Sequence, residues 1–129
     1  MKKIYIEFEG YKWDSYTFPE TDGIYAIYST YSSGEGRNVG KLQYIGKSNN
    51  LNRRIKEHAC SDYPRENKYC YSFCELYEDE CILAEAALIN RCKCGGNTDF
   101  VDNYPYENVS LYISGEHKDI PTKIIIVNS

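Results

Sequence analysis

The chain lacks the features of a secreted or membrane-anchored protein. Its 129 residues contain no apolar run long enough to cross a bilayer, and the first residues, Met-Lys-Lys followed by a strand-like pattern, do not have the form of a signal peptide. We therefore expect a cytoplasmic protein with no membrane partner and with reduced thiols. Internal repeats and low-complexity tracts are also missing, and the length predicts a single domain over residues 1–129.

An excess of basic charge is missing as well. The formal net charge of −4 argues against a protein that coats nucleic acid through bulk charge. The charges are unevenly distributed, however. The segment from Lys41 to His58 is basic, with Glu57 as its one acidic residue, whereas the segment from Glu75 to Glu85 is acidic and has no basic residue. A local basic face on an acidic protein is compatible with phosphate binding.

The six cysteines lack the paired C-x-x-C spacing of structural zinc sites. Cys92 and Cys94 are separated by one residue, and Cys70 and Cys74 by three. A zinc-binding interaction module is therefore an alternative with little support, which stoichiometric zinc in the purified protein would revive.

The hydrophobic pattern predicts an α+β fold. We expect strands at 3–8, 23–31, 42–47, 69–76, 109–113 and 123–127, and helices at about 50–58 and 79–91. The strands at 23–31 and 42–47 are predicted to form an antiparallel hairpin around a flexible loop at 32–40. With 69–76 they give a small central antiparallel sheet of three core strands flanked by helices. The strands at 3–8 and 123–127 are extra N- and C-terminal strands, which we expect to pair with each other.

Two polar side chains share one face of the first predicted helix. Arg54 and His58 are four residues apart, so they lie one helical turn from each other. A guanidinium group offers planar donors to a phosphate, and an imidazole moves protons near neutral pH. Considered alone, the pair is better explained as a solvated basic face than as a functional pair. Ser48, Asn49 or Asn50 is expected to cap this helix.

The second predicted helix carries Glu85 beside an apolar stripe. A carboxylate in such a position is unfavourable unless it is paired, reaches water or binds a cation. Three interpretations follow: an edge residue that extends to water, a salt bridge to Arg54, or a ligand of Mg²⁺, which takes one or two protein carboxylates together with water and phosphate oxygens.

These residues together resemble a known family. Gly23-Ile24-Tyr25 and Tyr44-Ile45-Gly46 are similar to the two halves of the GIY-YIG nuclease signature. Arg54 stands where the family has its arginine, and His58 matches a histidine found in several branches. Glu85 matches the metal-binding glutamate of the family. Asn97 matches an asparagine found in many members, and Lys47 matches a lysine found in some. The resemblance covers about residues 23–97, and the gap between the tripeptides is longer than in the shortest members. The extension at about 98–129 matches no accessory DNA-binding domain.

The resemblance implies a metal-dependent endonuclease that hydrolyses phosphodiester bonds in DNA. It implies that Glu85 holds Mg²⁺ or Mn²⁺, that Arg54 clamps the scissile phosphate, and that a tyrosine hydroxyl helps to take a proton from the attacking water. Tyr25 with His58 as a relay and Tyr44 alone are both sensible bases, so this choice stays open. The predicted catalytic residues are Tyr25, Tyr44, Arg54, His58 and Glu85, and the predicted substrate-binding residues are Lys47, Arg53 and Asn97.

The expected partner is double-stranded DNA, bound through the local basic segment. A homodimer would allow an enzyme with one site per chain to cut both strands. The main alternative is a catalytically inactive nucleic-acid-binding or regulatory domain with the same fold. Asn97 also has a simpler interpretation, because it follows two glycines and fits a turn.

Overall fold

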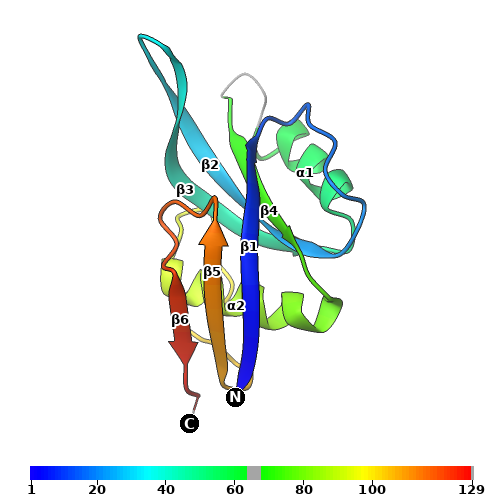
Figure 1. Ribbon diagram of the computed structural model, residues 1–129, viewed down its shortest axis with the longest axis vertical. Coiled ribbons are helices and arrows are strands. Elements are labelled where there is room, and N and C mark those ends of the chain that lie inside the picture. Colours follow the sequence, from blue (N-terminus) through cyan, green and yellow to red (C-terminus); the bar gives the residue numbers. More distant parts are fainter. Residues whose placement is uncertain (64–67, 129) are drawn as a thin grey trace.

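A six-stranded sheet and two helices make up the mixed α+β structure of the described residues, 1–63 and 68–128, in a computed structural model (Figure 1). The elements in chain order are β1 (Lys2–Lys12), β2 (Gly23–Ser33), β3 (Gly36–Ser48), α1 (Leu51–Cys60), β4 (Cys70–Glu75), α2 (Glu78–Cys92), β5 (Val109–Gly115) and β6 (Lys123–Ile126). Within these described ranges, no helix combines the length and the apolar character needed to span a bilayer.

The strands follow the order β3-β2-β4-β1-β5-β6. The three predicted central strands are neighbours, because β2 pairs antiparallel with both β3 and β4. The expected pairing of the first strand with the last is wrong. β5 lies between them, parallel to β1 and antiparallel to β6. The physical reason is burial: Ile4 and Ile6 of β1 face the fully or almost fully buried Leu111 and Ile113 of β5, whereas β6 is a short edge strand.

The predicted flexible loop at 32–40 is also wrong. The hairpin strands continue through this segment, with Ser32 opposite Arg37 and Ser33 opposite Gly36, and only Gly34 and Glu35 form the turn. Gly36 has a φ of +128°, a conformation that side chains disfavour, so a glycine is needed there. The composition indicates a loop because the strands are exposed at this end, and exposed strand residues need no apolar pattern.

Both faces of β2 are buried, and each face meets a different helix. Tyr25 and Ile27 point to α1, where they pack with Leu51 and Ile55 in one cluster. The alternate residues point to α2 and belong to the main core. Figure 1 shows α1 beside the upper part of the sheet and α2 crossing its lower half. A strand between two helices is a rigid support for any side chain that it presents.

Strand β1 connects the two halves of the sheet. Its first part, Lys2 to Phe8, pairs with β5, and the part after it, from Glu9, pairs with β4. Gly10 has a φ of +117°, and a Cβ atom there would lie 2.6 Å from the carbonyl oxygen of Tyr71. The glycine therefore permits the irregular pairing through which β1 passes from one partner to the other.

Candidate active site

Helix α1 places Arg54 and His58 against the hairpin. Asn50 is its N-cap, and the Oδ1 atom of Asn50 accepts a hydrogen bond of 3.0 Å from the backbone N–H of Arg53. Leu51 and Ile55 are fully buried against β2, which fixes the rotation of the helix. This rotation brings Arg54 and His58 towards the tyrosines. The cap is therefore Asn50, one of the three expected residues.

The pairing of β2 with β3 explains why the two tripeptides contain tyrosine and glycine where they do. Tyr25 lies directly opposite Gly46, and Tyr44 lies opposite Ile27, so both tyrosines share the face towards α1. A Cβ atom on residue 46 would collide with the ring and hydroxyl of Tyr25 and with the ring of Tyr44. The glycine thus leaves the space in which the Tyr25 side chain lies.

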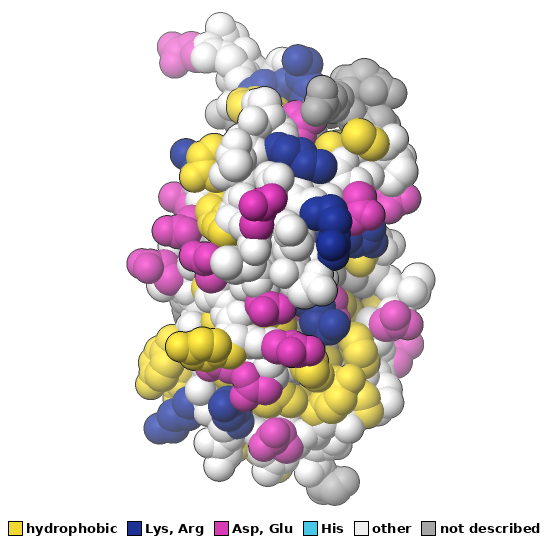
Figure 2. All heavy atoms as spheres, turned by 90° about the vertical axis from the view of Figure 1, so that its right-hand side faces the viewer, with side chains coloured by type: hydrophobic (Ala, Val, Ile, Leu, Met, Phe, Trp, Pro, Cys, Tyr) yellow, Lys and Arg dark blue, Asp and Glu magenta, His cyan; other side chains and the backbone are white. Residues whose placement is uncertain are grey.

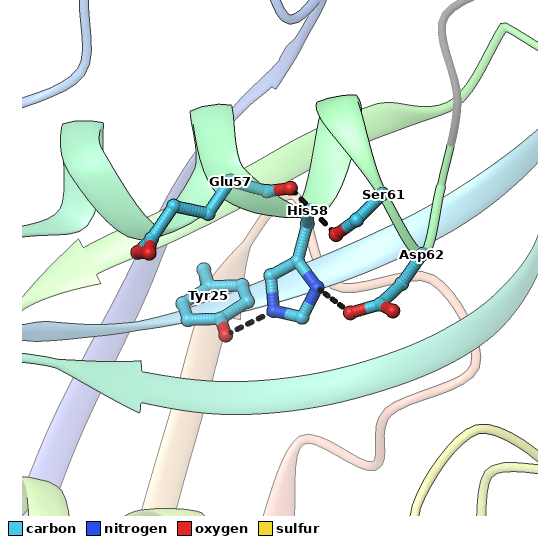
Figure 3. Close-up of polar contacts among 5 residues, drawn as sticks. All are labelled: Tyr25, Glu57, His58, Ser61 and Asp62. Atoms are coloured by element: carbon cyan, nitrogen blue, oxygen red, sulfur yellow. Dashed lines mark hydrogen bonds and ion pairs between the residues drawn. The ribbon is translucent and has the colours of Figure 1, made fainter.

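The two tyrosines and His58 form an aromatic cluster. The Tyr25 hydroxyl and Nε2 of His58 are 2.7 Å apart, a hydrogen-bond distance (Figure 3). The ring centroids of Tyr44 and His58 are 5.1 Å apart, and those of Tyr25 and Tyr44 are 6.1 Å apart. The structure therefore brings these three predicted residues to one place.

Asp62 and Tyr63 extend this cluster, and neither was selected from the sequence. Nδ1 of His58 lies 3.2 Å from Oδ2 of Asp62, with the distance of a hydrogen bond but not its angle. The rings of His58 and Tyr63 are 5.7 Å apart. Both residues follow α1 in a turn, where no periodic pattern marks them, although an acid four residues after a helical histidine is a usable signal.

Burial and charge tune the titration of the cluster. Burial raises the pKa of Tyr25 and of Tyr44, and the nearby Arg54 guanidinium opposes this rise for both. Burial lowers the pKa of His58, Arg54 lowers it further, and Asp62 opposes them. Consequently the phenols are protonated and the imidazole is neutral at pH 7. Proton transfer by a tyrosine in this cluster then needs a neighbouring acceptor.

Glu85 of α2 lies close to β3 and Tyr44. Its Oε2 accepts a hydrogen bond of 3.0 Å from the backbone N–H of Lys47, and it lines a pocket of about 80 Å³ with Tyr44, Asn97 and Asp99. Burial raises the pKa of Glu85, the charge of Lys47 lowers it, and Asp99 raises it. The ion pairs found among the described residues do not include the expected alternative between Glu85 and Arg54.

The environment of Glu85 fits a small divalent cation. The described part of the chain sends no hydrogen bond to its second oxygen, Oε1, and that pocket holds a second carboxylate, Asp99. Mg²⁺ and Mn²⁺ prefer such hard oxygen donors and complete their coordination with water and substrate oxygens. Glu85 is thus the residue that would hold the metal, and the sequence did not identify Asp99.

Asn97 fixes the loop that follows α2. Its Oδ1 accepts a hydrogen bond of 3.0 Å from the N–H of Ile45, and its Nδ2 donates one of 2.9 Å to the carbonyl of the same residue. The side chain therefore ties this loop to β3 at the residue next to Tyr44. Its predicted contact with substrate stays a prediction.

The other two predicted substrate-binding residues lie at the rim. The side chains of Lys47 and Arg53 are exposed, and the Arg53 guanidinium donates to Oδ1 of Asn49 at 2.7 Å. They do not join the aromatic cluster.

The cysteines are free thiols, and none of the described residues forms a group of three or more histidine, cysteine, aspartate or glutamate side chains that could hold a metal ion. The geometry thus adds no support for a zinc module.

Comparison with known proteins agrees with this geometry. A model of the GIY-YIG catalytic domain matches residues 22–93. The chain belongs to this family. At the level of the domain, the membership points to a nuclease-type function.

A similar protein is the UvrABC system protein C of Dictyoglomus thermophilum, with 28% identity over 103 residues. The alignment covers 74% of this chain and 16% of that protein, so the chain spans only a small part of its relative. No solved structure matches.

Proposed function

We propose that the chain is a metal-dependent endonuclease that hydrolyses phosphodiester bonds in DNA. The observation that carries this proposal is the convergence of two helices on the hairpin. β2 and β3 contribute the two tyrosines, α1 contributes Arg54 and His58, and α2 contributes Glu85, which lines a pocket with Tyr44. Family membership and the similarity to the UvrABC system protein C support the same reaction class.

Each group has a distinct task in this proposal. Arg54 lies close enough to both tyrosines to lower their pKa by its charge, so a phosphate bound to its guanidinium would lie beside the hydroxyl groups. There Arg54 stabilises the additional negative charge of the transition state. A tyrosine hydroxyl holds the attacking water and accepts its proton.

Glu85 would hold Mg²⁺ or Mn²⁺ in the pocket next to Tyr44. When bound, the cation supplies charge stabilisation at the phosphate and the leaving oxygen. The raised pKa of Glu85 has a consequence for metal binding: protons compete more strongly for this carboxylate than for an exposed one, so its affinity for metal falls as the pH falls.

The surface around α1 supports DNA as the substrate. Figure 2 shows this face, on which lysine and arginine side chains gather through the upper and middle parts with acidic side chains beside them. Arg53 and Lys47 are exposed at the rim of the site. We propose that double-stranded DNA binds there through its backbone, with an affinity that decreases steeply as salt increases. A homodimer would allow both strands to be cut, and sedimentation with and without DNA tests this.

Nicking of a supercoiled plasmid in Mg²⁺ tests the function. We expect the wild type to nick, and Glu85→Gln and Arg54→Gln to be slower by at least about 100-fold, because each loses charge stabilisation in the transition state. Glu78→Gln is the matched control, since Glu78 is exposed in the first turn of the same helix as Glu85. Manganese binding followed by calorimetry should be weakened by Glu85→Gln and unchanged by Glu78→Gln.

A different result identifies the alternative. If wild type and variants bind DNA and RNA with equal affinity but cut neither, the chain is a nucleic-acid-binding domain without activity.

A further inference from the structure

The turn after α1 brings Asp62 to the second nitrogen of His58. The backbone N–H groups of Ser61 and Tyr63 both donate to the carbonyl oxygen of His58, at 3.2 and 2.7 Å. The chain consequently folds back over the end of the helix and places Oδ2 of Asp62 3.2 Å from Nδ1. Figure 3 shows Tyr25 and Asp62 on opposite sides of the imidazole ring.

The two partners of His58 differ in what they can do. A carboxylate only accepts hydrogen bonds, so Asp62 favours the ring form that carries its hydrogen on Nδ1. In a neutral ring of this form, Nε2 has a lone pair and no hydrogen. Nε2 is then the acceptor for the hydroxyl of Tyr25, 2.7 Å away.

Tyr25, His58 and Asp62 form a row of contacting side chains, and their exposure to solvent differs along it. The side chain of His58 is 2% exposed and Tyr25 is 1% exposed, whereas the side chain of Asp62 is 62% exposed. The row therefore runs from the interior of the site to solvent. Because Asp62 is exposed, its carboxylate has room to turn towards Nδ1.

Tyr44 does not have an equivalent arrangement. Its ring contacts the ring of His58, with a centroid separation of 5.1 Å, but within the described residues no hydrogen bond joins its hydroxyl to either imidazole nitrogen. Both nitrogens already face Tyr25 and Asp62. The imidazole is thus placed to accept a proton from Tyr25 and not from Tyr44.

We propose that Asp62 is a positioning residue that fixes the tautomer of His58, and thereby makes Tyr25 the tyrosine that moves the proton. The proposal rests on the nuclease function and assigns its proton path. In the step, an O–H bond of the attacking water breaks and a new O–H bond forms on Tyr25. The original O–H bond of Tyr25 breaks, and its proton forms an N–H bond on Nε2 of His58.

The remaining bonds balance this step. The water oxygen forms the new bond to phosphorus, and the bond from phosphorus to the leaving oxygen breaks. Asp62 stabilises the imidazolium, which later returns its proton to solvent or to the leaving oxygen. Tyr25 ends each cycle protonated, in agreement with a buried phenol.

The charged and titratable groups near His58 determine which control is informative. They are Tyr25 of β2, Tyr44 of β3, Arg54 and Glu57 of α1, and Asp62 and Tyr63 of the turn. Glu57 is the suitable control, because its carboxylate points away from the imidazole (Figure 3) and it carries the same charge as Asp62. Glu57→Ala removes one negative charge and leaves the contact at Nδ1 in place.

Two measurements test the proposal. Nitrogen NMR of the imidazole should show the hydrogen on Nδ1 in the wild type and in Glu57→Ala, and a mixture of both ring forms in Asp62→Ala. The plasmid-nicking rate should fall about 10- to 100-fold in Asp62→Ala, less than when a proton-transfer residue itself is removed. Circular dichroism of Asp62→Ala should match the wild type, because the carboxylate is exposed.

Double variants identify the tyrosine. In a Tyr25→Phe background, Asp62→Ala should have no further effect on the rate, because the path it supports is already lost. In a Tyr44→Phe background it should retain its full effect. A full effect of Asp62→Ala in the Tyr25→Phe background overturns the proposal, as does a hydrogen on Nε2 in the wild type. If the wild type cuts no DNA, the nuclease function fails, and the NMR measurement alone still decides whether Asp62 fixes the tautomer.

Discussion

The hydroxyl of Tyr25 reaches His58 across a position that has no side chain. Gly46 lies opposite Tyr25 on the neighbouring strand, and its missing Cβ leaves the space that the phenol ring occupies. The second glycine has a comparable task, since a Cβ on Gly23 would meet the carbonyl of Cys74 and the side chain of Leu51. The glycines of the two tripeptides are thus required by packing, whereas the tyrosines are required by the chemistry of the proposed mechanism.

Replacement of Gly46 by alanine tests this requirement. We expect Gly46→Ala to lower the free energy of unfolding by about 1–3 kcal/mol, because the methyl group overlaps two aromatic rings. Activity should fall at least 10-fold, since the ring of Tyr25 must move away from His58. Urea unfolding and plasmid nicking measure the two effects. Gly34→Ala in the hairpin turn, where a Cβ meets nothing within 4 Å, is the control. Equal stability and activity of the two variants would contradict the packing argument.

Residues with a regular spacing were predictable, and residues in turns were not. The places of Tyr44, His58 and Glu85 around one site follow from the tripeptides, from helical periodicity and from the family resemblance. Asp62 and Asp99 lie in irregular segments, and they meet the site only because the chain turns back after each helix. Tertiary contacts of this kind leave no local pattern in a single sequence.

At the scale of the elements, α1 is a short helix that carries two residues of the proposed active site. Its first turn depends on one side chain, Asn50, and on two backbone contacts, from Leu51 to the carbonyl of Thr21 and from Asn52 to that of Pro19. A helix of 10 residues is marginal without such support. The position of Arg54 and His58 thus depends on the cap.

Removal of the cap has a measurable effect. We expect Asn50→Ala to lower the free energy of unfolding by about 1 kcal/mol and to increase amide exchange in the first turn of α1, because the N–H of Arg53 loses its acceptor. Hydrogen exchange followed by NMR and urea unfolding are the measurements. The neighbouring Asn49→Ala removes only a contact with an exposed guanidinium and should have less than half of this effect. An equal loss of stability in both variants would show that the cap does not hold the helix.

Hydrophobic periodicity predicted the helices and strands but not how the strands pair. All eight expected helices and strands are present, because each has a buried face that gives a repeating pattern. The distal part of the hairpin was missed because it is exposed, and the pairing of β1 with β6 was wrong because β5 lies between them. Pairing depends on contacts between distant segments, which periodicity does not encode.

For the molecule as a whole, burial of many weak acids predicts instability in alkali. Burial raises the pKa of Cys70, Cys74 and Cys94 to about 11 and the pKa of Cys81 and Cys92 to about 12. It also raises the pKa of several buried tyrosines. A group whose pKa is higher in the folded than in the unfolded state stabilises the fold below its unfolded pKa, and this contribution is lost as the pH rises.

We therefore expect the free energy of unfolding to decrease between pH 8 and pH 10.5, under reducing conditions, by about 2 kcal/mol for each buried thiol. Urea unfolding at several pH values measures the slope. Cys60 is exposed, so Cys60→Ser should leave the slope unchanged. Stability that is constant over this range would contradict the proposed burial of the thiols.

The two-part pairing of β1 has a consequence for the time at which the protein completes its fold during synthesis. The partners of β1 lie far along the chain, in β4 and in β5. At about 5–20 residues per second, the ribosome adds the residues between β1 and the end of β5 in roughly 5–20 s. Throughout that interval β1 lacks its β5 partner, and its side chains Ile4, Ile6 and Phe8, which are buried in the complete fold, are exposed. Exposed strands of this kind associate with other chains, so we expect the nascent protein to be most prone to aggregation until β5 arrives.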